Sequence, residues 1–250
     1  MKCMIFATRN FKELIRDPLS WIFCLGFPIV MLLIMSILNS SIPAESGMKL
    51  FEIQNLAPAI NVFGLTFIML FASLLLSNDR KESFLLRIFT SPMKPIDYMS
   101  GYMIPLIVLS IGQGIITSIS AIIISIIQNS NLDYINIIFS FIPSISSILL
   151  FTSLGLLIGT LFNKNAAPGI CSIFITFSGI LGGIWMDIDM IGGVLKSICN
   201  ALPFYYAVKS ARLAYSGDYF ESLLQSGIVL IWAVVITILA VIAFKKKMKQ

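Results

Sequence analysis

Residues 224–244 read LQSGIVLIWAVVITILAVIAF, and Lys245, Lys246 and Lys247 follow directly. The stretch contains no acidic and no basic residue. An α-helix rises about 1.5 Å per residue, so roughly 20 apolar residues cross the hydrocarbon core of a bilayer, which is about 30 Å thick. The lysines suit the cytoplasmic end of such a helix, where they anchor it at anionic lipid. The stretch therefore predicts a membrane span that ends in the cytoplasm.

Five more stretches of this kind precede it, and none of the six contains Asp, Glu, Lys or Arg. Of the 250 residues, 58% are hydrophobic and 12% are charged, and the mean hydropathy is +0.95. Soluble domains carry about twice that charged fraction, and so little polar surface could not cover a soluble globule. We therefore predict an all-α integral membrane protein. Its six spans are residues 19–38, 58–76, 102–127, 135–162, 166–186 and 224–244.

The positive charges set the orientation of these spans, because Lys and Arg collect in the cytoplasmic connections of membrane proteins. With the N-terminus inside, thirteen of the 17 Lys and Arg residues fall in cytoplasmic segments. Those that fall outside are Lys49, Lys196, Lys209 and Arg212. We expect both termini in the cytoplasm. We assign the net charge of +5 to topology and lipid contact, and we expect no nucleic-acid partner.

Three segments outside the spans have patterns of their own. Residues 4–17 are amphipathic and lead to Pro18, which predicts a helix on the cytoplasmic face and a turn into the first span. Residues 79–98 form the largest cytoplasmic loop. Residues 187–223 form the largest outside segment, and they are too apolar for a solvated loop. We expect short re-entrant helices in that last segment.

Residue types that several chemistries need are missing from the sequence. The chain has no histidine, so neither a metal site nor a membrane-embedded hydrolase is indicated. Its four cysteines form no CxxC pair, so a disulfide framework is not indicated either. Spans without charge argue against ion-coupled carriers and against channels built on charged rings. There is also no GxxxxGK(S/T) phosphate-binding loop. If the chain takes part in a pump, another chain must supply the ATP chemistry.

The loop after the second span reads NDRKESFLLRIFTSP from residue 78 to residue 92. Asn78 or Asp79 can cap the start of a helix, and Pro92 ends it. Four apolar side chains would share one face of this helix: Phe84, Leu85, Ile88 and Phe89. A short capped helix of this kind fits docking into a groove on a partner. It fits equally well a surface helix that rests on lipid headgroups.

An aromatic stripe runs along the second span. Phe63, Phe67 and Phe71 recur every four residues, with Asn61 and Thr66 nearby. Lipid contact or helix packing accounts for such a stripe. The functional alternative is an apolar, polarisable wall for an amphipathic cargo.

Small and polar residues recur in the other spans. The GxxxG pairs at residues 155–159 and 179–183 allow helix backbones to approach closely. We expect packing within the chain, with dimerisation as the alternative. Uncharged polar residues such as Gln113 and Thr176 are expected to satisfy hydrogen bonds between helices.

Four further stretches occur in a fixed order along the chain. They are FKELIRDP at residues 11–18, the loop over residues 80–92, NKN at residues 163–165, and LPFYYAVK at residues 202–209 with Arg212 and Gly217. In this order, and combined with six spans, they resemble the membrane subunits of ABC-2 type exporters, also known as type V ABC transporters. The family's loop usually has Gly-Thr and an acidic residue after a glutamate, whereas Glu82 is followed by Ser83, Phe84 and Leu85.

The resemblance implies one ABC-2 type transmembrane domain over residues 1–250. It has a connecting helix at residues 1–18, a coupling helix in the loop 79–98 and re-entrant helices within residues 187–223. It also implies a second permease subunit, in a homodimer or a related heterodimer, and two copies of a separate ABC ATPase subunit. ATP and Mg would be bound by that ATPase, and no cofactor by this chain. The implied location is the bacterial cell membrane, among lipids.

The same analogy assigns roles to residues. The ATPase would act through the coupling loop, at Arg80, Lys81, Glu82, Phe84, Leu85, Arg87, Ile88 and Phe89. Spans two and five would line the path at the dimer seam. The path candidates are then Asn61, Phe63, Thr66, Phe67, Phe71 and Thr176.

We therefore expect the permease subunit of an ATP-driven exporter. It would move an amphipathic or hydrophobic substrate out of the cell, such as a drug, an antimicrobial peptide or a lipid-like molecule, and so serve multidrug or bacteriocin resistance. One alternative is a secondary carrier or facilitator that works without an ATPase. The other is a membrane assembly subunit that transports nothing.

Overall fold

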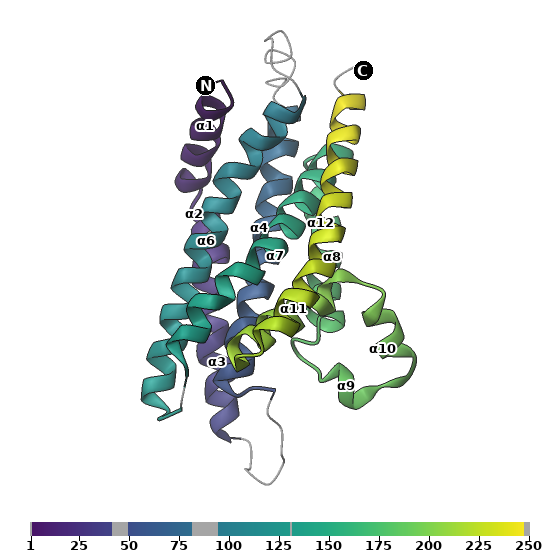
Figure 1. Cartoon of the computed structure of the whole chain (residues 1–250). Coiled ribbons are helices and arrows are strands. Elements are labelled where there is room, and N and C mark those ends of the chain that lie inside the picture. Colours follow the sequence, from purple (N-terminus) through teal and green to yellow (C-terminus); the bar gives the residue numbers. More distant parts are fainter. Residues whose placement is uncertain (1, 42–49, 82–94, 131, 248–250) are drawn as a thin grey trace.

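The computed structural model describes residues 2–41, 50–81, 95–130 and 132–247, and every regular element in these ranges is a helix (Figure 1). The first part of the chain forms α1 (Lys2–Arg16), α2 (Pro18–Trp21), the π-helix η1 (Ile22–Gly26), α3 (Phe27–Ser41), α4 (Ile53–Lys81) and α6 (Pro95–Ile127). The second part forms α7 (Tyr134–Leu161), α8 (Ala167–Leu181), α9 (Ile188–Ile191), α10 (Gly193–Asn200), α11 (Pro203–Ser216) and α12 (Tyr219–Lys247). The predicted all-α membrane fold is confirmed.

Five helical stretches are long and apolar enough to cross a membrane. They are Pro18–Ser41, Ile53–Arg80, Pro95–Ile127, Tyr134–Leu161 and Tyr219–Lys247. The sixth predicted span, residues 166–186, contains α8, which has 15 residues. At about 1.5 Å per residue such a helix is roughly 22 Å long, shorter than the hydrocarbon core of about 30 Å. The count of six spans therefore stays a prediction.

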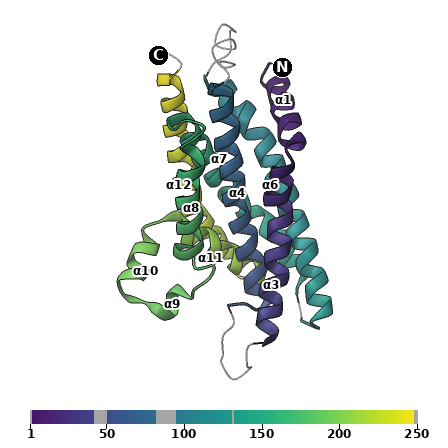
Figure 2. The same ribbon diagram turned by 180° about the vertical axis from the view of Figure 1, so that it is seen from behind.

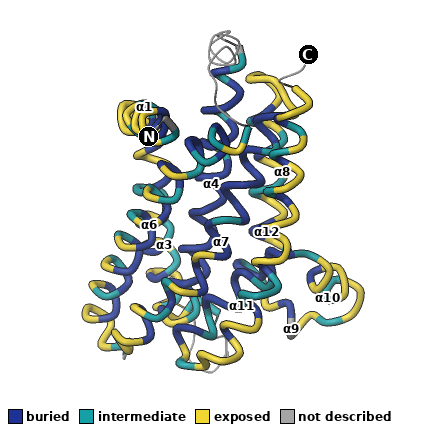
Figure 3. The backbone as a smooth tube through the Cα atoms, turned by 45° about the horizontal axis from the view of Figure 1, so that its top comes forward, coloured by how far each residue is buried: buried dark blue, intermediate teal, exposed yellow. Residues whose placement is uncertain are grey.

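Helices α4 and α7 form the centre of the bundle, and the other long helices surround them (Figure 3). In α4, 89% of the apolar stretch is buried, compared with 22% in α12 and in the first span. Helix α4 therefore packs against protein on nearly all sides, whereas α7 keeps apolar side chains exposed near its start, at Ile135, Ile138 and Ile142. The outer helices keep apolar side chains exposed, as helices that face lipid or another subunit do.

Two glycines bring α7 close to α4. A Cβ atom on Gly159 would lie 2.7 Å from the carbonyl oxygen of Ser73, and a Cβ on Gly155 would collide with the carbonyl oxygen of Met69. Only glycine fits at both positions, because any side chain would push the two backbones apart. The GxxxG pair at residues 155–159 thus serves packing within the chain. In the pair at residues 179–183, Gly183 lies beyond the end of α8 with a φ of 71°.

The first span is interrupted by the π-helix η1, which ends just before Pro28. The Phe27 N–H donates to the Ile22 carbonyl, five residues earlier. Proline has no N–H and its ring crowds the carbonyl four residues before it, here that of Cys24. A wider turn at this point removes that conflict while the other backbone groups stay bonded, as a lipid environment requires.

Helices α9, α10 and α11 occupy the segment that the sequence assigns to short helices, at the end of the bundle away from the two termini (Figure 2). Helix α11 begins at Pro203 and ends at Ser216, and the Gly217 that follows has a φ of 86° that suits glycine. Ser210 and Ser222 exchange hydrogen bonds, each hydroxyl donating to the other's carbonyl at 3.0 and 2.8 Å. These bonds hold α11 against α12.

Candidate functional site

The two helix ends that flank residues 82–94 form the candidate site. We define the loop root as the end of α4, residues 79–81, together with the first two turns of α6, residues 95–102. It lies at the end of the bundle where both termini are found (Figure 1). These residues are the described neighbours of residues 82–94 in the chain.

Asp79 is the buried centre of the loop root, with only 1% of its surface exposed. Arg9 of α1 donates two hydrogen bonds to its carboxylate, at 2.6 and 2.7 Å. The Tyr102 hydroxyl of α6 donates a third, at 2.7 Å. A paired guanidinium–carboxylate contact of this geometry offsets the cost of burying the charge. One carboxylate therefore ties three helices together.

Helix α1 reaches this position because one of its faces packs on the start of α6. The ring of Phe6 makes edge contacts with Tyr98 and Tyr102, at centroid distances of 5.9 and 4.9 Å. The Asn10 side-chain amide donates to the carbonyl of Gly101 at 3.1 Å. A Cβ on Gly101 would lie 2.5 Å from the Phe6 ring, so the absence of a side chain permits the contact. These contacts hold Arg9 within reach of Asp79.

Arg80 connects the loop root to a different helix. Its guanidinium donates to the carbonyls of Gly159 and Phe162 at 2.9 and 3.1 Å, and also to that of Thr160. These carbonyls belong to the end of α7. Carbonyl groups at a helix end have no N–H partner within the helix, and they attract positive charge. Consecutive residues thus bind in two directions, Asp79 to α1 and α6, and Arg80 to α7.

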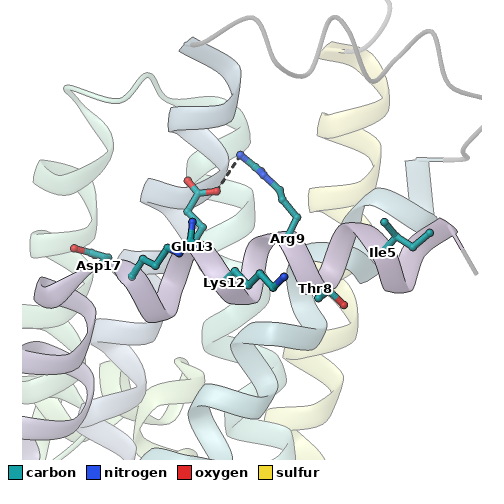
Figure 4. A pocket seen from close by; sticks show the side chains of 7 residues that line it. Ile5, Thr8, Arg9, Lys12, Glu13 and Asp17 are labelled. Atoms are coloured by element: carbon teal, nitrogen blue, oxygen red, sulfur yellow. Dashed lines mark ion pairs between the residues drawn. The ribbon is translucent and has the colours of Figure 1, made fainter.

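The exposed side of α1 carries a charged groove of about 770 Å³ (Figure 4). It is lined by Ile5, Thr8, Arg9, Lys12, Glu13, Arg16 and Asp17. Arg9 also pairs with Glu13 at 2.9 Å. Partial burial lowers the pKa of Arg9, but the hydrogen bonds and charge of Asp79 outweigh it and leave the pKa above its ordinary value. Arg9 is therefore a fixed cation between the groove and the buried carboxylate.

The structure describes part of the predicted coupling set. Arg80 lies in the last turn of α4, and Lys81 is the final residue of that helix. The remaining residues, Glu82, Phe84, Leu85, Arg87, Ile88 and Phe89, lie outside the described residues. The coupling role of the whole set, Arg80 and Lys81 included, stays a prediction.

The predicted path residues lie mainly inside the chain. Phe63, Phe67 and Phe71 are all buried. Phe67 packs on Phe27 of the first span at 4.7 Å between centroids, and Phe63 on Trp185 at 5.4 Å. Of the two readings of the aromatic stripe, the observed contacts are those of helix packing.

The polar path candidates also have partners within the chain. The backbone carbonyl of Asn61 accepts from the Gln113 amide at 3.0 Å, and the Thr66 hydroxyl donates to the carbonyl of Phe63 at 2.6 Å. Thr176 lies on the exposed side of α8 and donates to the carbonyl of Ser172 at 3.0 Å. Among the six path candidates, only Thr176 has an exposed side chain.

Sequence reasoning missed Arg9 and Tyr102, and it placed Asp79 differently. Asp79 does not cap a helix that starts in the loop, because α4 continues through Lys81. A carboxylate in the last turn of a helix is unfavourable unless a cation pairs with it. That conflict indicates that Asp79 needs a cationic partner. The sequence does not identify the partner, because Arg9 lies 70 positions away in the chain.

The chain was compared with known protein families and with curated proteins. No curated protein matches this chain. Residues 1–215 match the family described as ABC-2 type transporter, a range that includes the loop root and most of α11. The match confirms the family that the order of the four stretches predicts, and the apolar helices make the chain a multi-pass membrane protein. The protein therefore belongs to the ABC-2 type transporter family, as a permease subunit of an ABC transporter.

Proposed function

We propose that this permease exports an amphipathic or hydrophobic substrate and takes its energy from a separate ATPase that acts on the loop 82–94. The observation that carries the proposal is the buried Asp79 carboxylate, which binds Arg9 of α1 and Tyr102 of α6 directly beside that loop. ATP and Mg would be bound by the ATPase. Two ATPase copies and a second permease subunit would complete the transporter.

The contacts of the loop root suggest how a movement of the loop would spread. Asp79 would carry it to α1 and α6, and Arg80 would carry it to the end of α7. Because packed helices move as rigid bodies, a displacement at the root would reach the other end of the bundle rather than dissipate locally. The charged groove on α1 offers the ATPase a second contact beside the loop.

The nature of the cargo is proposed from the exposed surfaces of the spans. Large apolar side chains are exposed along the outer helices, for example Val30 and Leu33 of α3 and Ile173 and Phe177 of α8. The six predicted spans contain no charged residue. A path between two such subunits would favour a drug, an antimicrobial peptide or a lipid-like molecule over an ion.

The test compares variants in vesicles that contain the permease with its ATPase. Phe84→Asp is expected to reduce copurification of the ATPase, because it would put a charge on the apolar face that the sequence predicts for this loop. Arg9→Gln is expected to leave copurification intact and to lower ATP-driven transport at least about tenfold. The reason is that a movement of the loop would no longer pass from Asp79 to α1. Lys246→Gln removes an exposed cation at the same end of the bundle and should change neither quantity.

Two results would count against the proposal. One is full ATP-driven transport by both Phe84→Asp and Arg9→Gln at equal amounts of folded protein. The other is transport by the purified permease alone, driven by an ion gradient, which would establish a secondary carrier.

A further inference from the structure

A small cationic pocket lies at the opposite end of the bundle from the loop root. It is formed by α11, the start of α4 and the C-terminal end of α8, and it has a volume of about 200 Å³. Its lining residues are Asn55, Gly182, Tyr205, Lys209, Arg212, Leu213 and Ser216. Two of these are cations and none is a carboxylate.

Arg212 is the innermost of the two cations. Its Nε donates to the carbonyl of Asn55 at 3.2 Å, whereas its buried Nη2 has no hydrogen-bond partner. Burial lowers the pKa of Arg212 to about 10, and the charges of Asp187 and Tyr205 offset only part of that effect. The guanidinium is therefore still charged at neutral pH. A largely buried charge without a counter-ion is costly, and a bound anion beside the guanidinium would lower that cost.

Lys209 lies one helical turn before Arg212 on the same side of α11. Its ammonium lies 5.6 Å from the centre of the Tyr205 ring. Across the described residues, neither Lys209 nor Arg212 is within ion-pair distance of a carboxylate. Tyr205 and Ser216 also belong to the lining, and the Ser216 hydroxyl donates to the carbonyl of Leu213 at 3.0 Å.

We propose that this pocket binds one phosphate or carboxylate group. A guanidinium and an ammonium on neighbouring turns of α11 can hold such a group from two sides, and among the described residues no carboxylate within ion-pair distance competes for either cation. A space of about 200 Å³ accommodates a single acidic group but is smaller than the pockets that enclose drug-sized ligands, which span about 300–1,000 Å³. The bound group belongs either to the headgroup of an anionic lipid or to a free anion. The proposal is independent of the energy source for transport.

The experiment measures thermal unfolding of the purified full chain in two settings. In neutral detergent, inorganic phosphate is titrated against chloride at matched ionic strength. In lipid nanodiscs, phosphatidylglycerol is compared with phosphatidylcholine. The variants are Lys209→Gln and Arg212→Gln, and Lys196→Gln of α10 is the control, since it removes a cation that does not line the pocket.

We expect a saturable rise in the unfolding midpoint with phosphate, with phosphatidylglycerol, or with both. A response to phosphate identifies a free-anion site, and a response to phosphatidylglycerol alone identifies a lipid site. Lys209→Gln should weaken the response about tenfold or more, since it removes a charge-assisted hydrogen bond, and Lys196→Gln should not.

The proposal fails if neither anion changes the unfolding midpoint of the native chain. It also fails if Lys209→Gln responds like the native chain. Arg212→Gln loses the bond to Asn55 as well, so its folding can suffer, and Lys209→Gln then decides the question alone.

Discussion

The environment of Asp79 shows how a single residue acquires its role from partners that are distant in sequence. It is an acidic residue in the last turn of α4, where the helix dipole disfavours negative charge. It is nevertheless buried, because Arg9 and Tyr102 provide three hydrogen bonds to its two oxygens. Arg9 itself is shared with Glu13, which is partly exposed. One cation therefore takes part in a buried pair and in a surface pair.

The two pairs of Arg9 should differ in strength. Asp79→Asn is expected to lower the free energy of unfolding by about 2–4 kcal/mol, because it leaves Arg9 without its buried partner. Glu13→Gln should cost less than about 1 kcal/mol, since exposed ion pairs are weak. Equilibrium unfolding in mixed micelles measures both. In the double variant Arg9→Gln/Asp79→Asn, the effects should be clearly less than additive, and additive losses would contradict the direct pairing.

The close approach of α4 and α7 is the main feature at the scale of elements. The backbone of α4 at Met69 and Ser73 contacts α7 at Gly155 and Gly159, where a side chain has no room. Arg80 then bonds to the carbonyls that end α7. The two helices are thus joined along the bundle and again at the loop root, which makes them the rigid pair around which the outer helices pack.

This packing predicts opposite outcomes for two glycine substitutions. Gly155→Ala should lower the free energy of unfolding by about 1–3 kcal/mol, because its Cβ meets backbone that cannot yield easily. Gly112→Ala in α6 meets no atom within 4 Å and should be neutral or slightly stabilising, since alanine favours the helix. The same mixed-micelle unfolding experiment checks both. Equal effects of the two substitutions would rule out close packing at Gly155.

At the scale of the whole molecule, α4 connects the two ends of the bundle. Its first turn accepts a hydrogen bond from Arg212 beside the cationic pocket, and its last turn carries Asp79 and Arg80. Both termini lie at the end of the loop root, and α9 to α11 lie toward the other end (Figure 1). The charged groove and the cationic pocket are therefore expected on opposite sides of the membrane.

Cysteine labelling tests this arrangement in a Cys3→Ser background, where the other native cysteines, Cys24, Cys171 and Cys199, are buried. Cysteine is introduced at exposed Thr8, Val194 or Lys246. A membrane-impermeant maleimide should label position 194 in intact cells and positions 8 and 246 only after lysis. This follows from the excess of positive charge at the end with the termini. Labelling of positions 8 and 194 from the same side would contradict both the fold and the topology.

The sequence by itself determined the membrane class, five of the six predicted spans as long apolar helices, the short helices before α12 and the family, because these depend on local composition and on the order of segments. Only the tertiary structure decided that α4 and α7 are central, that the phenylalanine stripe packs inside the chain, and that Asp79 pairs with Arg9. It also decided that Arg212 keeps an unpaired nitrogen in a cationic pocket. The physical reason is that burial and pairing depend on contacts between residues far apart in the chain, which no local pattern encodes.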